Sequence, residues 1–336
     1  AKFFKNRVGV DVSLYTKDSE DLIIDLDLDN STGYSSSTVN SASINNKGVE
    51  AILNVIPVQS RDFTWDVTAS FSLLRSEVIS IADGIDQIYV GGYVGRGNIA
   101  IPGLPYGILE GEVIRRDYGS LDGTDHTQVH WDDRTNYTPI VNANGGYQFL
   151  GYGVIGNPQP DFVYGVTNTL SYKWATLRVQ FDSQVGGDVF STTNSTLLGR
   201  GILQETDFDR FVPVVTNGLS ADGTPNTTQT TANAHYWPNT GVFYDENSIY
   251  DASVMRLREV SLSFVAPKSF LNGTPFGNAS LTLSAQNIWH YAWNTPSGTN
   301  FDPEVISYGA GSNARGFDEM TGPTAKKYGA TLSLTF

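Results

Sequence analysis

The sequence has no cysteine and little charge, and both absences narrow the classes of protein to consider. The absence of Cys among the 336 residues excludes disulfide bonds, thiol catalysis and cysteine-ligated metal. Only 17% of the residues are charged, against about a quarter in a typical soluble domain. The formal net charge is −14, which argues against a nucleic-acid partner because nucleic acid is bound by basic patches.

Long apolar runs and catalytic motifs are absent as well. No stretch approaches the roughly 20 consecutive apolar residues that a transmembrane helix needs. A membrane protein with this sequence must therefore be a closed β-barrel, because an open sheet edge in lipid leaves backbone groups unpaired. The sequence contains no GxSxG, HExxH or phosphate-binding loop. Carboxylate pairs such as Asp207/Asp209 are expected by default in an acidic protein, so we predict neither an enzyme nor a cofactor.

Alternation of apolar and polar residues is the clearest pattern present. Residues 62–80 carry one apolar parity, formed by Phe63, Trp65, Val67, Ala69, Phe71 and Leu73. Residues 155–190 predict two strands joined by a short turn at Tyr172–Lys173, with Asn168 interrupting the apolar side. Side chains alternate faces along a strand, so each strand has an apolar and a polar side. Such strands fit a soluble sandwich, whose apolar face meets a second sheet, or a membrane barrel, whose apolar face meets lipid.

The connections between the predicted strands decide between these two folds. Three are short or moderate: 59–62, 172–173 and 266–279. Four are long loops: 17–48, 81–160, 190–250 and 290–325. The two kinds alternate along eight predicted strands, as expected for an outer-membrane barrel with short periplasmic turns and long outer loops. The sequence therefore favours an all-β fold, an antiparallel transmembrane β-barrel with long extracellular loops.

Aromatic residues near the strand ends support the same fold. Such rings are enriched at both membrane interfaces, so we predict two girdles, one at the short turns and one at the long loops: Trp65, Tyr172 and Trp174, and Trp289 and Tyr291. The chain ends in an alternating strand closed by Phe336. We interpret this terminal Phe as the signal by which the barrel assembly machinery recognises the last strand.

Several motifs resemble the barrel of the SusC/RagA family of TonB-dependent outer-membrane transporters. Residues 155–162 read IGNPQPDF and residues 184–190 read QVGGDVF. The other matching stretches follow in the order of the family: VDVSLYTKDSEDLI, INNKGVEAIL, FTWDVTASFSLLRSEVISI, DASVMRLREVSLSFVAPKSFL, LTLSAQNIWHYAW, FDPEV and YGATLSLTF. Together they touch most of the chain, and they resemble the C-terminal part of the family's barrel.

The resemblance implies an architecture, a location and a function. Family members combine an N-terminal plug with a barrel of about 22 strands. They import oligosaccharides or peptides across the cell outer membrane, energised by the TonB complex and covered by a SusD-like surface lipoprotein. We therefore expect residues 1–336 to be barrel wall and outer loops of a larger nutrient importer. Its partners would be outer-membrane lipid, the assembly machinery, the SusD-like lipoprotein and, through an N-terminal region absent from this chain, the TonB complex.

Candidate site residues come from the loops and from the family motifs. The candidates for ligand contact are the loop aromatics Trp131, Tyr236, Trp237 and Trp293, because rings stack on sugar or peptide faces. The alternative is that these rings pack within the loops or against the lipoprotein. We interpret the motif residues as structural: Gly156, Asn157, Pro158, Pro160, Phe301, Asp302 and Pro303. An Asp-Pro pair favours a turn and would fix loop geometry.

Two clusters could suggest a metal site, and we predict none at either. Asp25, Asp27 and Asp29 would share one face of an extended segment, as oxygen ligands for calcium, but no glycine turn closes the run. His126 and His130 lie in a polar setting typical of a loop. Both clusters are interpreted as solvated loops.

Two other function classes stay open beside nutrient import. One is a structural or adhesive outer-membrane barrel that holds a surface assembly without transport. The other is a soluble all-β carbohydrate-binding module. A plug with a TonB box in upstream sequence would distinguish import from adhesion, and partition between detergent and buffer would test the soluble module.

Overall fold

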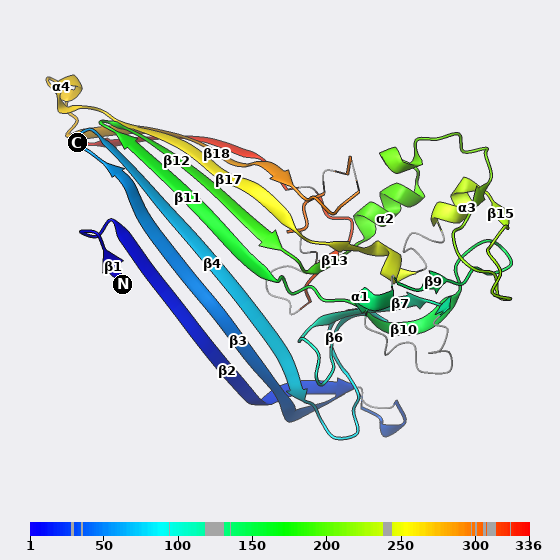
Figure 1. Ribbon diagram of the computed structural model, residues 1–336. Helices are drawn as coiled ribbons and strands as arrows, with labels where there is room; N and C mark the ends of the chain where they lie inside the picture. The colour runs from blue at the N-terminus through cyan, green and yellow to red at the C-terminus, as the bar shows by residue number, and fades with distance from the viewer. Residues whose placement is uncertain are drawn as a thin grey trace.

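The computed structural model is organised around one nine-stranded sheet (Figure 1). It describes residues 1–27, 30–34, 36–93, 95–117, 131–134, 136–237, 244–296, 298–299, 301–304, 307, 314–322 and 324–336. The strand order is β1-β2-β3-β4-β11-β12-β17-β18-β20, and neighbouring strands are antiparallel. The order follows the chain, so each strand of this sheet pairs with the sheet strands that come before and after it in the sequence. We refer to this sheet as the wall.

The wall consists of one very short strand and eight longer ones. Their bounds are β1 (Lys2–Phe3), β2 (Val8–Asp27), β3 (Ser36–Gln59), β4 (Phe63–Ser80), β11 (Phe162–Tyr172), β12 (Ala175–Val185), β17 (Val254–Val265), β18 (Asn278–Tyr291) and β20 (Lys327–Thr335). Each of the eight predicted strands has a counterpart among them, and the predicted antiparallel all-β fold is confirmed. Within the described ranges, no helix is both long and apolar enough to cross a membrane.

Cross-strand register carries one apolar face and one polar face across the wall. One continuous row of paired residues is almost entirely apolar: Val8, Val55, Val67, Asn168, Val179, Val260, Ala285 and Tyr328. The next row is polar: Gly9, Asn54, Thr68, Thr167, Gln180, Glu259, Gln286 and Lys327. A slip of one residue would invert every side chain of a strand, so this register fixes the two faces.

The apolar face of the wall is not covered by any other described part of the chain at several of its large side chains. Val12, Leu283 and Leu332 on this face are 56%, 45% and 65% exposed. A soluble sandwich buries such a face against a second sheet, whereas a membrane barrel presents it to lipid. The exposure therefore fits a membrane barrel and does not fit a soluble sandwich.

The three longest connections of the wall all lie at one of its two ends (Figure 1). The turns at 60–62 and 173–174 and the segment 266–277, which contains α4 (Lys268–Leu271), lie at one end. The described parts of the connections 81–161, 186–253 and 292–326 lie at the other end, where they gather into a folded mass. Strands β2 and β3 are joined at this same end by residues 28–35 alone, so the predicted alternation of short and long connections does not hold there. The wall therefore has a short-turn end and a long-loop end.

The predicted loop at 17–48 is wrong over most of its length. Strand β2 continues to Asp27 and β3 starts at Ser36, and the two pair along most of this extension. The backbone of a Ser- and Asn-rich segment can pair in a sheet as well as that of an apolar segment, where neither face of the sheet contacts lipid. The apolar alternation that marks a membrane strand is therefore weak here, although the backbone ladder continues.

The long loops contain short strands of their own. A four-stranded sheet has the order β10-β7-β6-β5 and a three-stranded sheet has the order β16-β13-β19. Their bounds are β5 (Ile88–Tyr93), β6 (Arg96–Ala100), β7 (Ile108–Ile114), β10 (Phe149–Gly156), β13 (Asp188–Ser191), β16 (Ile249–Asp251) and β19 (Phe317–Asp318). The remaining described elements are β8 (Arg116–Asp117), β9 (Thr138–Pro139), β14 (Val214–Val215), β15 (Gln229–Thr230), α1 (Trp131–Arg134), α2 (Thr192–Gly199), α3 (Ala232–Trp237), η1 (Asn30–Thr32), η4 (Gln204–Thr206) and η6 (Asp245–Ser248).

A buried apolar cluster joins these two small sheets. It consists of Leu109, Val113, Ile155, Phe190 and Phe317, all of them at most 4% exposed. The rings of Phe190 and Phe317 are 5.7 Å apart. We refer to the four-stranded and three-stranded sheets with this cluster as the loop-side core. It unites segments that are more than 200 positions apart in the sequence.

Candidate ligand-facing surface

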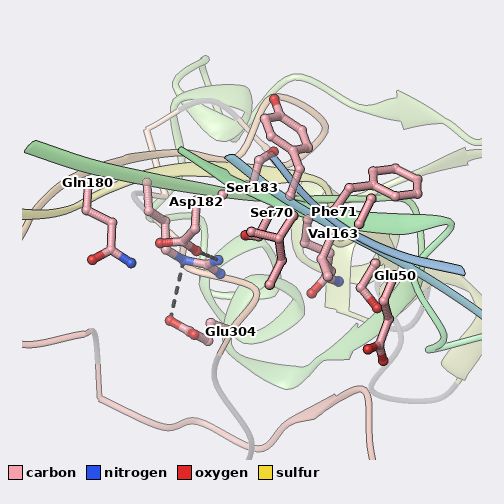
Figure 2. Close-up of a pocket in the computed structure, with 15 residues that line it drawn as sticks. Glu50, Ser70, Phe71, Val163, Gln180, Asp182, Ser183 and Glu304 are labelled. Atoms are coloured by element: carbon pink, nitrogen blue, oxygen red, sulfur yellow. Dashed lines mark hydrogen bonds and ion pairs between the residues drawn. The ribbon is translucent and has the colours of Figure 1, made fainter. Parts of the chain in front are cut away.

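A cavity of about 500 Å³ lies on the polar face of the wall, towards the long-loop end. Strands β3, β4, β11, β12 and β17 contribute its lining, and Glu304 contributes from the 301–304 segment. Figure 2 shows Asp182 and Glu304 on either side of a guanidinium group, with Ser70 and Gln180 nearby. We refer to this space as cavity 1.

Two arginines connect the 301–304 segment to the wall beside cavity 1. The Arg256 guanidinium donates to Asp302 Oδ1 from Nε and Nη2, at 3.1 and 2.8 Å. Arg258 makes bidentate bonds to Asp182, at 2.7 and 2.8 Å, and to Glu304, at 2.8 and 2.9 Å. Bidentate arginine–carboxylate pairs are strong and directional. The network therefore fixes the position of the 301–304 segment over the cavity.

A β-bulge in β17 contributes to this arrangement. Leu257 pairs with Phe181 and Glu259 pairs with Gln180, which leaves Arg258 as the extra residue. A bulge bends a strand and redirects a side chain. Arg258 can therefore reach both its neighbour on β12 and the 301–304 segment.

Asp302 is the most buried carboxylate of this network. It also accepts a hydrogen bond from Thr324 Oγ1 at 2.7 Å and from the Glu304 N–H at 3.1 Å. Burial alone would raise the pKa of Asp302, but the hydrogen bonds and charge of Arg256 outweigh it and hold the pKa below its ordinary value. Asp302 is therefore ionised at neutral pH. Phe301, next to it, packs against Val189 and Ala252.

The GNPQP motif interlocks with the glycine pair of QVGGDVF. The Asn157 N–H donates to Asp188 Oδ2 at 2.7 Å, and the Asp188 N–H donates to the Asn157 carbonyl at 2.7 Å. A Cβ at Gly156 would lie 2.8 Å from Asp188 Oδ2. Gly187 has φ +83°, and a Cβ there would lie 3.1 Å from the Pro158 carbonyl oxygen. Only glycine fits these positions without displacement, so the motif sets how the chain enters β11.

A second cavity, of about 310 Å³, adjoins the first on the polar face, and we refer to it as cavity 2. Both are lined by Ser72 and Val163. The remaining lining residues of cavity 2 are Asn46, Leu74, Ser76, Tyr106, Gly107, Pro158, Gln159, Pro160, Phe162 and Arg315. Two residues of the predicted structural motif, Pro158 and Pro160, thus border a space large enough for part of a small ligand. Cavities 1 and 2 together form the candidate ligand-facing surface.

Three of the four aromatics predicted to contact ligand pack within the loops. Trp131 lies against the cluster of Ile99, Ile108 and Val154. The Tyr236 ring lies 6.0 Å from that of Phe208. The Arg200 guanidinium lies 4.7 Å from the centroid of the Trp237 ring. Their ligand contact stays a prediction.

The fourth, Trp293, is 40% exposed and lines a separate cavity of about 350 Å³. None of the four borders cavity 1 or cavity 2 among the described residues. Sequence reasoning missed Arg256 and Asp182, although both belong to the polar parity near the long-loop ends of their strands. It also missed Arg315, for which no local pattern gave a signal.

The predicted girdle residues lie at the two ends of the wall. Trp65 Nε1 donates to Asn168 Oδ1 at 3.2 Å, which explains the polar residue that interrupts the apolar side of β11. The others are largely exposed: Tyr172 55%, Trp174 51%, Trp289 46% and Tyr291 57%. Leu281 shares the row of Tyr172, and Trp289 lies eight residues further along β18, roughly 26 Å. For a strand tilted by about 40°, it corresponds to roughly 20 Å along the membrane normal, somewhat less than an apolar band about 25 Å tall.

The remaining predicted positions divide between described and undescribed residues. Phe336 is 87% exposed, and its ring lies 5.3 Å from that of Phe276. His126, His130 and Asp29 lie outside the described residues, as do the side chains of Asp25 and Asp27. Elsewhere in the described ranges, no group of three or more His, Asp or Glu could hold a metal ion.

Comparison with known proteins gives relatives along nearly the whole chain. No protein-family model matches it. TonB-dependent receptor P3 of Formosa agariphila is 26% identical over 361 residues, covering 99% of this chain and 33% of the receptor. TonB-dependent receptor SusC of Bacteroides thetaiotaomicron is 22% identical over 276 residues, covering 78% of this chain and 24% of the receptor. This chain spans about a third of the length of the curated relatives that it matches.

Solved structures share the fold. The RagAB peptide transporter matches with a TM-score of 0.65 at 19% identity, covering 99% of this chain and 34% of that chain. The "closed-closed" state of the RagAB peptide importer matches with a TM-score of 0.67. This likeness and the two-faced sheet define the class of fold as the wall of an antiparallel transmembrane β-barrel.

Within that class, the chain is similar in sequence to proteins named TonB-dependent receptor, SusC among them. The resemblance to the SusC/RagA family that its motifs predict is thereby confirmed. The relatives are named as receptors and the solved structures as transporters, and neither name denotes an enzyme.

Proposed function

We propose that the protein imports a nutrient, an oligosaccharide or a peptide, across the outer membrane, with this chain as barrel wall and outer loops. The observation that carries the proposal is the placement of cavities 1 and 2. Both lie on the polar face, opposite the exposed apolar face that fits lipid. A barrel wall built this way presents binding groups to the lumen and apolar groups to the membrane.

The partners of the importer are part of the same proposal. The relatives are TonB-dependent receptors, and the structural neighbours are complexes named RagAB. We infer that this protein pairs with a SusD/RagB-like lipoprotein over the loop-side core and draws energy from the TonB complex. The loop-side core supports this inference because it offers a folded surface at the long-loop end, in place of separate mobile loops.

Uptake by cells tests the proposal. The gene for the full-length protein would be deleted and restored, and uptake of labelled oligosaccharides and peptides would be measured with and without a proton-gradient uncoupler. We expect at least one substrate to enter only the restored cells, and only while the inner membrane is energised. Uptake that is independent of the gene would contradict import and favour the structural or adhesive barrel.

A matched pair of variants tests the role of the ligand-facing surface. Ser72→Trp would fill the junction of the two cavities, because Ser72 lines both. Thr331→Trp places the same ring on the polar face of β20, at a residue that lines neither. We expect uptake to fall at least several-fold more in the Ser72 variant, at equal amounts of protein in the outer membrane. Equal losses in both variants would show that the ring acts only by narrowing the lumen.

A further inference from the structure

The two cavities of the ligand-facing surface differ in charge. Cavity 1 contains the carboxylates Glu50, Asp182 and Glu304 against the single cation Arg256. Cavity 2 contains the cation Arg315 and no Asp or Glu. The chain has 35 acidic residues and only 21 Lys and Arg. A cationic cavity without acids is therefore a local departure from the acidic balance of the whole protein.

Arg315 is held by hydrogen bonds of its own backbone and by the two residues that follow it. Its N–H donates to Asn98 Oδ1 at 2.8 Å, and Asn98 Nδ2 donates to its carbonyl at 3.2 Å. Asn98 is fully buried. Gly316 follows with φ +74°, where a Cβ would lie 2.5 Å from Pro158 Cβ, and Phe317 is anchored in the loop-side core. The base of the Arg315 side chain is therefore fixed at the rim of cavity 2 before any ligand arrives.

The Arg315 guanidinium makes no ion pair among the described residues, unlike the other arginines close to the cavities. Arg256 and Arg258 are neutralised by wall and loop carboxylates, and Arg75 pairs with Asp161 at 3.0 Å. An arginine presents planar donors that match a carboxylate in a bidentate manner. The Arg315 guanidinium is therefore available to pair with an anionic group of a ligand in cavity 2.

Neutral donors surround this charge. Gln159 Oε1 accepts the Ser76 N–H at 3.3 Å, which leaves the two Nε2 hydrogens of the amide for another acceptor. Burial raises the pKa of Tyr106, and the charge of Arg315 offsets this in part, so the phenol is protonated at neutral pH and can donate. Leu74 and Pro158 add apolar surface beside these donors. The cavity therefore fits an organic anion with an apolar or ring-like body.

We propose that cavity 2 binds a carboxylate group of the transported molecule, with Arg315 as its ionic partner and Tyr106 and Gln159 as neutral donors. The inference rests on the proposed function and deepens it, because it names a chemical feature of the substrate. The carboxylate belongs either to a uronic-acid unit of an oligosaccharide or to a peptide. These two sources share the recognition chemistry and are separated by the experiment.

Binding to the full-length protein, purified in detergent, tests the proposal. The probes are two pairs: trigalacturonic acid with its methyl ester, and N-acetyl-trialanine with its C-terminal amide. Each pair is equilibrated with the protein, and the bound members are quantified by mass spectrometry. In one pair we expect the acid to bind roughly tenfold to a hundredfold more tightly than its neutral counterpart, the range for a charge-assisted contact. The pair that shows the preference identifies the source of the carboxylate.

Two variants separate the charge of Arg315 from general electrostatics. Arg315→Gln should abolish the preference for the acid, and Arg315→Lys should retain only part of it, because lysine lacks the bidentate fork. Arg178→Gln is the matched control, since Arg178 lies on the polar face, makes no ion pair with a residue that the structure describes, and lines neither cavity. The preference should survive in that variant. The side chain of Arg315 is exposed and the Asn98 bonds involve only its backbone, so Arg315→Gln should fold.

Three outcomes would overturn the carboxylate site. They are equal binding of acid and neutral counterpart in both pairs, a preference that is unchanged in Arg315→Gln, and no binding of either acid. Binding to purified protein needs no energy from the inner membrane. A carboxylate preference without energised uptake would therefore refute import and keep the site, whereas uptake without the preference would refute only the site.

Discussion

The wall and the loop-side core are both built of β-strands, yet they place their apolar side chains differently. Leu332 in β20 of the wall is 65% exposed, on the face that fits lipid. Leu109 in β7 of the loop-side core is 0% exposed, within a cluster that includes Phe190 and Phe317. The same residue type thus depends on the surrounding membrane in one region and on the protein's own packing in the other.

This difference implies different sources of stability. The wall keeps its backbone paired by long ladders, which lipid requires because it offers no hydrogen bonds. The loop-side core has strands of only two to eight residues, and it gains stability by removing apolar surface from water. A loss of packing should therefore open the loop-side core locally and leave the wall intact.

The largest expected effect comes from Leu109→Ala. Leu109 is fully buried, and removing its side chain should destabilise the loop-side core by about 2–5 kcal/mol. Local opening with this free-energy change should accelerate amide hydrogen exchange in residues 108–114 and 149–156. Exchange in 162–172 of the wall should change little.

Leu332→Ala is the matched control for that prediction, since it deletes the same atoms from the exposed apolar face. Its effect in a lipid bilayer should stay below about 1 kcal/mol, because the lost contact is with lipid. Faster exchange in residues 162–172 of Leu109→Ala, or in residues 108–114 of Leu332→Ala, would contradict the view that the two regions are stabilised separately.

A smaller effect is expected at Asp302, where the two regions meet. Asp302→Asn leaves buried Arg256 without its closest carboxylate, so residues 301–304 should be loosened by about 2 kcal/mol. The pKa of Asp302 is lowered in the folded protein, so its contribution is present at neutral pH. It is lost as the pH falls below the ordinary value of 3.8 towards the lowered pKa. Proteolysis between 292 and 326, measured across this pH range, reports the loosening.

Glu304→Gln serves as the comparison, because the Glu304 side chain is 46% exposed and its pairing is screened by solvent. We expect a clearly smaller increase in proteolysis than for Asp302→Asn. A difference between wild type and Asp302→Asn that stays constant down to acid pH would show that the charge of Asp302 does not hold the segment.

The wall could be predicted from the sequence because its two faces meet different surroundings. Between Phe63 and Leu73, apolar side chains for the lipid face alternate with polar side chains for the lumen face. This pattern is local, so it can be recognised without knowing the rest of the fold. The extension of β2 to Asp27 was missed because a strand that extends beyond the lipid gains no stability from alternating apolar and polar side chains, and the sequence signal is therefore weak there. Its backbone pairing is set by the continuing ladder with β3.

The loop-side core and the ligand-facing surface depend on contacts that no local pattern contains. Phe190 and Phe317 pair across 127 positions, the difference between their residue numbers. Arg315 is placed by Asn98, which is 217 positions away. The aromatic rings expected to contact ligand were chosen by residue type, and type alone does not tell a packed Trp131 from an exposed Trp293. The motif residues around Pro158 were recognised, but the cavity beside them was not.

The smallest expected effect has the opposite sign and concerns Glu112 in β7. One carboxylate oxygen of Glu112 is buried without a hydrogen-bond partner. Burial raises the pKa of Glu112 and the charge of Asp245 adds to this, while Arg96 partly offsets both. The ionised form is therefore disfavoured in the folded state, and stability is lost as the pH rises from the ordinary value of 4.5 through the raised pKa.

Glu112→Gln should remove this unfavourable charge and stabilise the loop-side core at neutral pH by less than about 1 kcal/mol, because solvent screens a partly exposed group. Hydrogen exchange in residues 108–114 should slow at pH 7.5 and match the wild type below pH 4.5, where Glu112 is protonated in both states. Asp66→Asn, on the polar face of the wall, controls for the loss of one negative charge and should leave this exchange unchanged. Faster exchange in Glu112→Gln at pH 7.5 would mean that the attraction of Arg96 outweighs burial, and that the loop-side core depends on this attraction as the 301–304 segment depends on Asp302.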